Sequence, residues 1–218
     1  MNRLITTRQI TTPTFRLPVT TSEAELLLHR AYAVEVARRG MGLRPDADTR
    51  LHLRRMAEAL TADHPRGGLF LCGSCGNGKT TSLLALQRVI ATLASVSAFD
   101  DAYPEARGSF SFGLRIVDAR DVLSLARDAR HMGLLRTETL LALEDLGREA
   151  TEVMDFGNVL SPVVELLECR YARQLFTVIT TNLSPEDFSR KYGERIADRM
   201  REMMTRIVFA NGSYRAGR

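Results

Sequence analysis

A lysine and a threonine that follow a glycine-rich loop are the residues best suited to bind phosphate. Gly73, Gly78, Lys79 and Thr80 fit the pattern G-x-x-x-x-G-K-[ST]. Glycines let the backbone curl so that successive N–H groups point at an anion, while the lysine and the hydroxyl reach the terminal phosphates and magnesium. The pattern predicts a phosphate-binding loop. Its candidate nucleotide-binding residues are Gly73, Ser74, Cys75, Gly76, Asn77, Gly78, Lys79, Thr80 and Thr81.

The residues that flank this loop support the interpretation. The apolar run 69–72 is typical of a buried strand, and apolar residues at helical spacing follow from 83 to 93. A helix that starts at the loop adds the partial positive charge of its N-terminus. Cys72 and Cys75 have redox-motif spacing, but no further Cys/His cluster completes a zinc site. We therefore interpret both cysteines as variable residues of the loop.

A pair of carboxylates ends a second apolar run. Residues 140–143 are apolar, and Glu144 and Asp145 follow them. A strand that delivers a carboxylate beside the loop can hold magnesium through water, and a second carboxylate can polarise an attacking water. The pair is therefore a candidate for the catalytic and magnesium-binding part of the site.

An amide follows a third strand. Residues 175–180 are apolar and β-branched, and they lead to Thr181 and Asn182. In a parallel sheet this strand end would lie between the two earlier ones. Ser184 and Pro185 already provide a good start for the next helix, which leaves Asn182 free for the site.

The last thirty residues are basic. Residues 189–218 carry eight Arg or Lys and three Asp or Glu, and eight minus three gives a charge of +5. Such a segment suits nucleic acid or a nucleotide phosphate, but it is equally typical of a solvated helix with internal ion pairs. Arg195 and Arg199 lie four residues apart on one helix face, where Asp198 or Glu202 could pair with either.

The elements that position these residues alternate between strands and helices. Two helices, over 22–40 and 51–60, follow an extended or partly disordered arm over the first twenty residues. Later we expect a polar surface loop at 100–109, single helices at 121–130, 159–173 and 184–204, an irregular stretch at 146–158 and a last strand at 207–209. Five apolar strands between helices predict an α/β fold of three layers with a mainly parallel sheet. We expect the chain to consist of an N-terminal arm with a short helical extension at 1–65 and a nucleotide-binding domain at 66–218.

The composition and the short apolar runs argue against a disordered chain and against a membrane protein. With 44% hydrophobic and 26% charged residues the chain is expected to be a globular protein. Its apolar runs are too short to cross a bilayer and its start does not resemble a signal peptide, so we expect a cytoplasmic protein without a membrane partner. Three cysteines agree with a reducing compartment.

Several stretches together resemble the DnaC/IstB branch of the AAA+ ATPases, which includes bacterial replicative-helicase loaders and transposition-helper ATPases. The similarity covers roughly residues 66–216, and its motifs match in order and spacing. The stretches that carry it are residues 68–80, 143–147, 170–171, 180–184, 192–199 and 213–215.

The resemblance implies a role for each site residue. Lys79 would contact the β- and γ-phosphates of ATP. Thr80 and Glu144 would bind Mg²⁺, with Glu144 replacing the usual aspartate, and Asp145 would be the catalytic carboxylate. Asn182 would orient water against the γ-phosphate.

Three arginines complete the implied site. Arg215 would be a second sensor that contacts nucleotide in its own subunit. Arg195 or Arg199 would be an arginine finger for a neighbouring subunit, a role that accelerates phosphoryl transfer by about 10³–10⁵-fold. The chain is therefore expected to form a homo-oligomer when ATP is bound.

The implied function is an ATP-hydrolysing factor of DNA replication or transposition. Its expected partners are single-stranded DNA and a replicative helicase or a transposase. The chain departs from the family pattern in lacking a recognisable helicase-binding domain within 1–65. It ends soon after Arg215, which leaves no room for the C-terminal helical lid common in AAA+ proteins and agrees with this branch. A nucleotide-gated adaptor with little hydrolysis is the alternative, and a small-molecule phosphotransferase is a third reading.

Overall fold

A five-stranded parallel sheet forms the centre of the molecule. The computed structural model describes residues 15–43, 46–95, 113–149, 153–155 and 158–214. The strand order is β2-β3-β6-β1-β7, and every pairing in this sheet is parallel. The strands are β1 (Gly68–Gly73), β2 (Arg115–Asp118), β3 (Leu140–Leu146), β6 (Phe176–Thr181) and β7 (Thr205–Phe209). The predicted α/β fold is confirmed.

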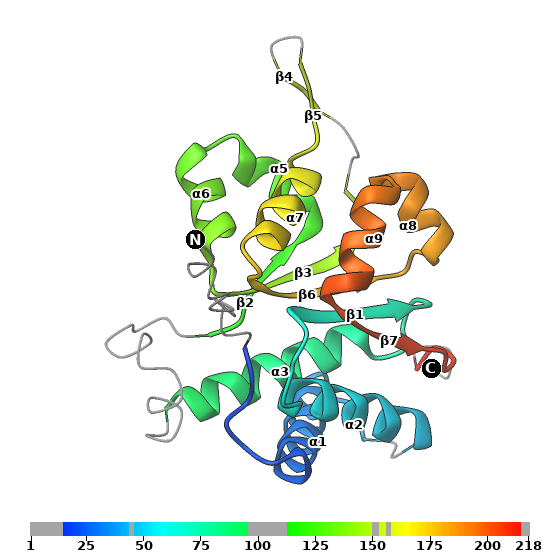
Figure 1. Ribbon diagram of the computed structural model, residues 1–218. Helices are drawn as coiled ribbons and strands as arrows, with labels where there is room; N and C mark the ends of the chain where they lie inside the picture. Colours follow the sequence, from blue (N-terminus) through cyan, green and yellow to red (C-terminus); the bar gives the residue numbers. More distant parts are fainter. Residues whose placement is uncertain (1–14, 44–45, 96–112, 150–152, 156–157, 215–218) are drawn as a thin grey trace, which may run out of the picture.

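Helices cover both faces of the sheet and make the three layers that the sequence predicts (Figure 1). One face carries α1 (Thr21–Arg38), α2 (Ala47–Thr61) and α3 (Lys79–Ala94). The other carries α5 (Ala119–Ala126), α6 (Ala129–Thr137), α7 (Pro162–Ala172), α8 (Pro185–Tyr192) and α9 (Glu194–Met203). Along β3, Leu140 and Ala142 join the core under α1–α3, whereas Leu141 and Leu143 join the opposite core, as the two-residue period of a strand requires.

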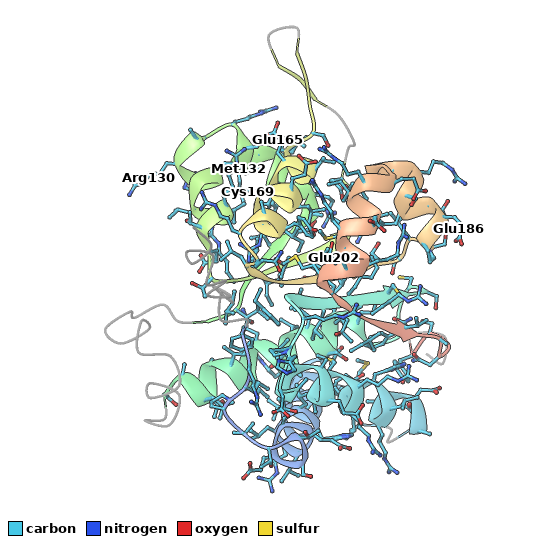
Figure 2. The ribbon with its side chains drawn as sticks, viewed as in Figure 1. Arg130, Met132, Glu165, Cys169, Glu186 and Glu202 are labelled. Carbon is cyan, nitrogen blue, oxygen red and sulfur yellow. The ribbon has the colours of Figure 1, made fainter. Side chains whose placement is uncertain are left out.

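Charged side chains lie on the outer surfaces of the helices. Figure 2 shows the charged side chains of Arg130 on α6 and Glu186 on α8 pointing away from the sheet. Glu202 of α9 instead faces α7, where its carboxylate accepts a hydrogen bond of 2.6 Å from the hydroxyl of Tyr171. None of the helices in the described part of the chain combines the length and apolar character needed to cross a bilayer.

Capping residues explain where the helices begin. Thr20 and Glu23 form a reciprocal capping box, so α1 begins one residue before the predicted start at Ser22. Ser184 caps α8 with Pro185 in its first turn, as predicted. The prediction of one helix over 184–204 was wrong, because Gly193 has φ 87° and separates α8 from α9.

Other boundaries also differ from the sequence predictions. The single helix expected at 121–130 is two helices, because Asp128 caps α6 through the N–H of Arg130. The stretch expected to be irregular contains β4 (Val153–Asp155) and β5 (Asn158–Leu160), which pair antiparallel. Residue 159 therefore lies in a strand, and α7 begins at Pro162.

Residues 15–19, the described part of the N-terminal segment, pack against the helical layer. Leu17 is fully buried, and its N–H donates a hydrogen bond of 2.8 Å to the carbonyl of Leu60. Residues 15–19 are therefore fixed against α2, while the first fourteen residues of the expected arm lie outside the described residues. The expected surface loop at 100–109 also lies outside them.

Candidate functional site

The loop between β1 and α3 has the backbone shape of an anion cradle. Gly73, Gly76 and Gly78 have φ values of 144°, 82° and 99°. A Cβ atom on Gly73 would lie 2.2 Å from the carbonyl oxygen of Phe209, so the loop needs glycine there. The predicted order of strand, loop and helix is confirmed, and we call residues 73–80 the P-loop.

Lys79 fills the inside of the P-loop. Its Nζ donates to the carbonyls of Gly73 (2.8 Å) and Ser74 (2.7 Å) and to Oδ1 of Asn77 (3.0 Å). Burial lowers the pKa of Lys79, while the carboxylate of Asp145 opposes that shift. Asn77 is buried and donates 2.7 Å to the carbonyl of Phe209, so β7 fixes the loop around the amine.

The ends of β3 and β6 bring the predicted polar residues to the P-loop. Asp145 and Asn182 line the same pocket as Lys79 and Thr80. The N–H of Asp145 donates 2.9 Å to Oγ1 of Thr180, which ties the two strand ends together. The register of β3 shifts after residue 143, and Asp145 has φ 55°. This irregularity turns the chain at the position of the predicted catalytic carboxylate.

Glu144 lies differently from its neighbour. It is half-buried, and it pairs in register with Asp118 of β2. Glu144 is not among the residues that line the pocket, whereas Asp145 is.

The P-loop pocket has a volume of about 900 Å³, within the range of small-molecule sites. Its walls come from α1, α2, the segment 40–43, the P-loop, the ends of β3 and β6, and the segment after β7. Sequence reasoning missed most of the residues on the helical side, since they lie far from the motifs in the chain. The lining residues that it assigned no role include Tyr32, Arg39, Asp46, Thr49, Arg148 and Tyr214.

Tyr214 connects the end of the described chain to the P-loop. Its N–H donates 2.9 Å to the carbonyl of Gly76, and its hydroxyl donates 2.8 Å to Oδ2 of Asp46. Burial and this carboxylate raise the pKa of Tyr214 to about 12, so the hydroxyl keeps its proton at neutral pH. The neighbouring Arg215, predicted to be the second sensor, lies outside the described residues.

Arg39, the residue that follows α1, reaches the P-loop helix. It lines the pocket, and its Nη1 donates 2.9 Å to Oγ1 of Thr81. With Lys79 and Arg148 it gives the pocket three basic side chains, against the carboxylates of Asp46 and Asp145. This charge balance favours a polyanionic ligand.

Arg195 and Arg199 lie on α9, away from the P-loop pocket. Both pair with one carboxylate, that of Glu168 on α7, rather than with Asp198 or Glu202. The guanidinium of Arg199 also lies 5.1 Å from the ring centre of Tyr171. Arg195 has 71% of its side chain exposed and Arg199 29%, so Arg195 is the more accessible to another subunit.

The residues of the P-loop pocket fit a magnesium nucleotide better than an isolated metal ion. The described residues contain no group of three or more His, Cys, Asp or Glu that could hold a metal. Thr80 offers one hydroxyl and the end of β3 offers the carboxylate of Asp145 to the pocket, so phosphate oxygens and water would supply the other ligands. The glycine cradle with a buried lysine is the matching site for those phosphates.

Comparison with known proteins finds likeness in structure alone. No protein family and no curated protein matches the sequence. The crystal structure of the DnaC helicase loader superposes with a TM-score of 0.53 at 20% identity, over 76% of this chain and 92% of that one. The chain shares the fold of that helicase loader. The crystal structure of DnaI gives 0.51 at 21% identity, over 75% of this chain and 86% of that one. The three-layer fold implied by the resemblance to the DnaC/IstB branch is thus confirmed.

Proposed function

We propose that the chain is an ATP-binding and ATP-hydrolysing protein of DNA replication that acts like a helicase loader. The observation that supports this best is the convergence of Lys79, Thr80, Asp145 and Asn182 on one pocket beside the P-loop. The fold shared with the DnaC helicase loader favours replication over transposition.

Lys79 contacts the β- and γ-phosphates from inside the P-loop. Thr80 would hold Mg²⁺ from the pocket, and Glu144, which does not line the pocket, would do so through water. The ion would neutralise charge on the phosphates. Asp145 accepts the proton of the attacking water while Asn182 orients that water. A new bond then joins the water oxygen to the γ-phosphorus as the bond to the β–γ bridging oxygen breaks, leaving ADP and phosphate.

Assembly completes the proposed site. Arg195 or Arg199 reaches the nucleotide of a neighbouring subunit in an ATP-dependent homo-oligomer, and Arg215 contacts the nucleotide of its own subunit. Single-stranded DNA and a replicative helicase are the proposed partners in the cytoplasm. Few aromatic residues are available for stacking, so arginine contacts to the DNA backbone would dominate binding.

A nucleotide-gated adaptor is the second candidate, and one contact favours it. Oδ2 of Asp145 lies 2.5 Å from Nη1 of Arg148, so the predicted catalytic carboxylate is engaged in an ion pair. If this pair persists with ATP bound, hydrolysis would be slow and the protein would act by presenting a surface.

Two variants and one titration test the proposal. Lys79→Ala should lose ATP binding, whereas Asp145→Asn should bind ATP and stop hydrolysis; retention of both activities by both variants would exclude this site. Turnover should rise with protein concentration and with single-stranded DNA. A flat rate near zero under all conditions, with ATP binding intact, would favour the adaptor.

A further inference from the structure

A tight turn after β3 places an arginine on the predicted catalytic carboxylate. Asp145 and Gly147 have φ values of 55° and 111°, and the N–H of Arg148 donates 3.2 Å to the carbonyl of Asp145. The turn folds the Arg148 side chain back, so that its Nη1 lies 2.5 Å from Oδ2 of Asp145. Both side chains line the P-loop pocket together with Lys79. A basic group besides Lys79 and Arg39 therefore faces the pocket.

The backbone on both sides of Arg148 is fixed. Glu149 is buried; its Oε2 accepts 2.9 Å from the N–H of Gly147 and its Oε1 accepts from the hydroxyl of Tyr192. Nζ of Lys191 donates 2.7 Å to the carbonyl of Gly147 and 2.6 Å to that of Glu149. The base of the Arg148 side chain is thus held by α8, and movement is left to the side chain.

The ion pair itself is weak enough to exchange. The Arg148 side chain is 53% exposed and that of Asp145 23%, which places the pair close to solvent. Pairs of this kind have small net interaction energies because water screens them and ordering two side chains costs entropy. A terminal phosphate carries more charge than a carboxylate and accepts two parallel hydrogen bonds from a guanidinium. A phosphate within reach would therefore compete well for Arg148.

We propose that Arg148 is a γ-phosphate-binding residue that exchanges Asp145 for the nucleotide. With a nucleoside triphosphate bound, the guanidinium moves to the γ-phosphate and the Asp145 carboxylate is released. With a nucleoside diphosphate the ion pair stays closed. This inference rests on the nucleotide-binding part of the proposed function, and it holds whether the protein hydrolyses ATP quickly or acts as an adaptor.

The test compares two nucleotides on four proteins. Affinities for ADP and for a non-hydrolysable ATP analogue, both with Mg²⁺, are measured by calorimetry on wild type, Arg148→Ala, Asp145→Asn and Arg190→Ala. Arg190 is the matched control, because it pairs with Asp187 at the same spacing, with Nη1 and Oδ1 2.6 Å apart, and does not line the pocket. Thermal unfolding of each variant checks that it is folded.

The expected results separate the two nucleotides. Arg148→Ala should weaken binding of the ATP analogue about tenfold or more, the usual effect of losing a hydrogen bond to a charged group, and leave ADP unchanged. Asp145→Asn removes the competitor for Arg148, so the analogue should bind several-fold tighter. Arg190→Ala should change neither affinity.

Other results would overturn the inference. Equal weakening of both nucleotides by Arg148→Ala, or no weakening of either, would show that Arg148 does not bind the γ-phosphate, while the proposed function would stand. A wild-type protein that binds neither nucleotide would overturn the proposed function and this inference with it.

Discussion

Arg170 is a buried arginine whose replacement should destabilise the fold without altering the site. It is 1% exposed, and its guanidinium donates to the carbonyls of Leu135 (3.0 Å), Glu138 (2.7 Å) and Phe176 (2.7 Å) and to Oγ1 of Thr177 (2.8 Å). These bonds join α6 and α7 to the beginning of β6. Replacement by methionine keeps the apolar stem and removes every donor.

The expected loss follows from two opposing effects. Two buried carbonyls and the part-buried one of Glu138 lose a donor, at about 2 kcal/mol each, the middle of the usual range, or about 6 kcal/mol together. Burial lowers the pKa of Arg170 from 12.5 to about 10. At about 1.4 kcal/mol per pH unit, this shift means that the fold destabilises the charged guanidinium by about 3 kcal/mol. The methionine variant carries no charge and regains that free energy. We therefore expect Arg170→Met to lower the free energy of unfolding by about 3 kcal/mol.

Equilibrium unfolding in urea followed by circular dichroism measures this loss. With a slope of about 2 kcal/mol per M, the midpoint should fall by about 1.5 M. Arg173→Met is the control, because Arg173 lies on the exposed end of the same helix, and its midpoint should stay within about 0.3 M of wild type. An unchanged midpoint for Arg170→Met would refute the reasoning, since it would mean that the carbonyls find other donors. Nucleotide affinity of the folded variant should match wild type.

Glu35 of α1, which is buried, pairs with the partly exposed Arg88 of α3, and this pair should make stability depend on pH. Hydrogen bonds from Arg88 hold the pKa of Glu35 in the folded protein below its ordinary 4.5. The pair therefore stabilises the fold fully above pH 4.5, and this stabilisation is lost as the pH falls through the lowered pKa of the folded state. Glu35→Gln should flatten the acid side of a plot of Tm against pH. Gly73→Ala would place a Cβ 2.2 Å from a backbone oxygen of β7, and it should cost about 2 kcal/mol or more in urea unfolding and abolish ATP binding. Arg195→Ala or Arg199→Ala should lower ATP turnover about 10³-fold at high protein concentration, and unchanged turnover in both would exclude a trans arginine finger.

The sheet and the P-loop could be predicted because their signals are local. Strand, loop and helix follow one another around Lys79, and the apolar runs before Asp145 and Asn182 end at polar residues. Parallel strands deliver their carboxyl ends to one edge, so the meeting of these three residues follows from the fold class.

The helical wall of the pocket could not be predicted because its contacts are long-range. Tyr214 binds Asp46 of the segment before α2, and Arg39 binds Thr81 of α3. No spacing in the sequence signals a partner so far away. The break between α8 and α9 had a local signal in Gly193, but helical periodicity on both sides obscured it. Gly147 makes the turn that positions Arg148 because it has a positive φ. The glycine is visible in the sequence, but its conformation is not.

The loop that carries Arg148 and the helix that carries the candidate fingers are directly connected. Lys191 and Tyr192, which hold the loop through Glu149, are the last two residues of α8. Gly193 follows, and α9 begins at Glu194; Arg195 is its second residue and Arg199 lies about one turn further on. Because Lys191 and the buried Glu149 are joined by hydrogen bonds as well as by charge, the loop cannot shift without breaking these contacts or moving the start of α9. In the proposed oligomer, a change at the γ-phosphate that reached this loop would act on the start of α9 through Lys191 and Tyr192.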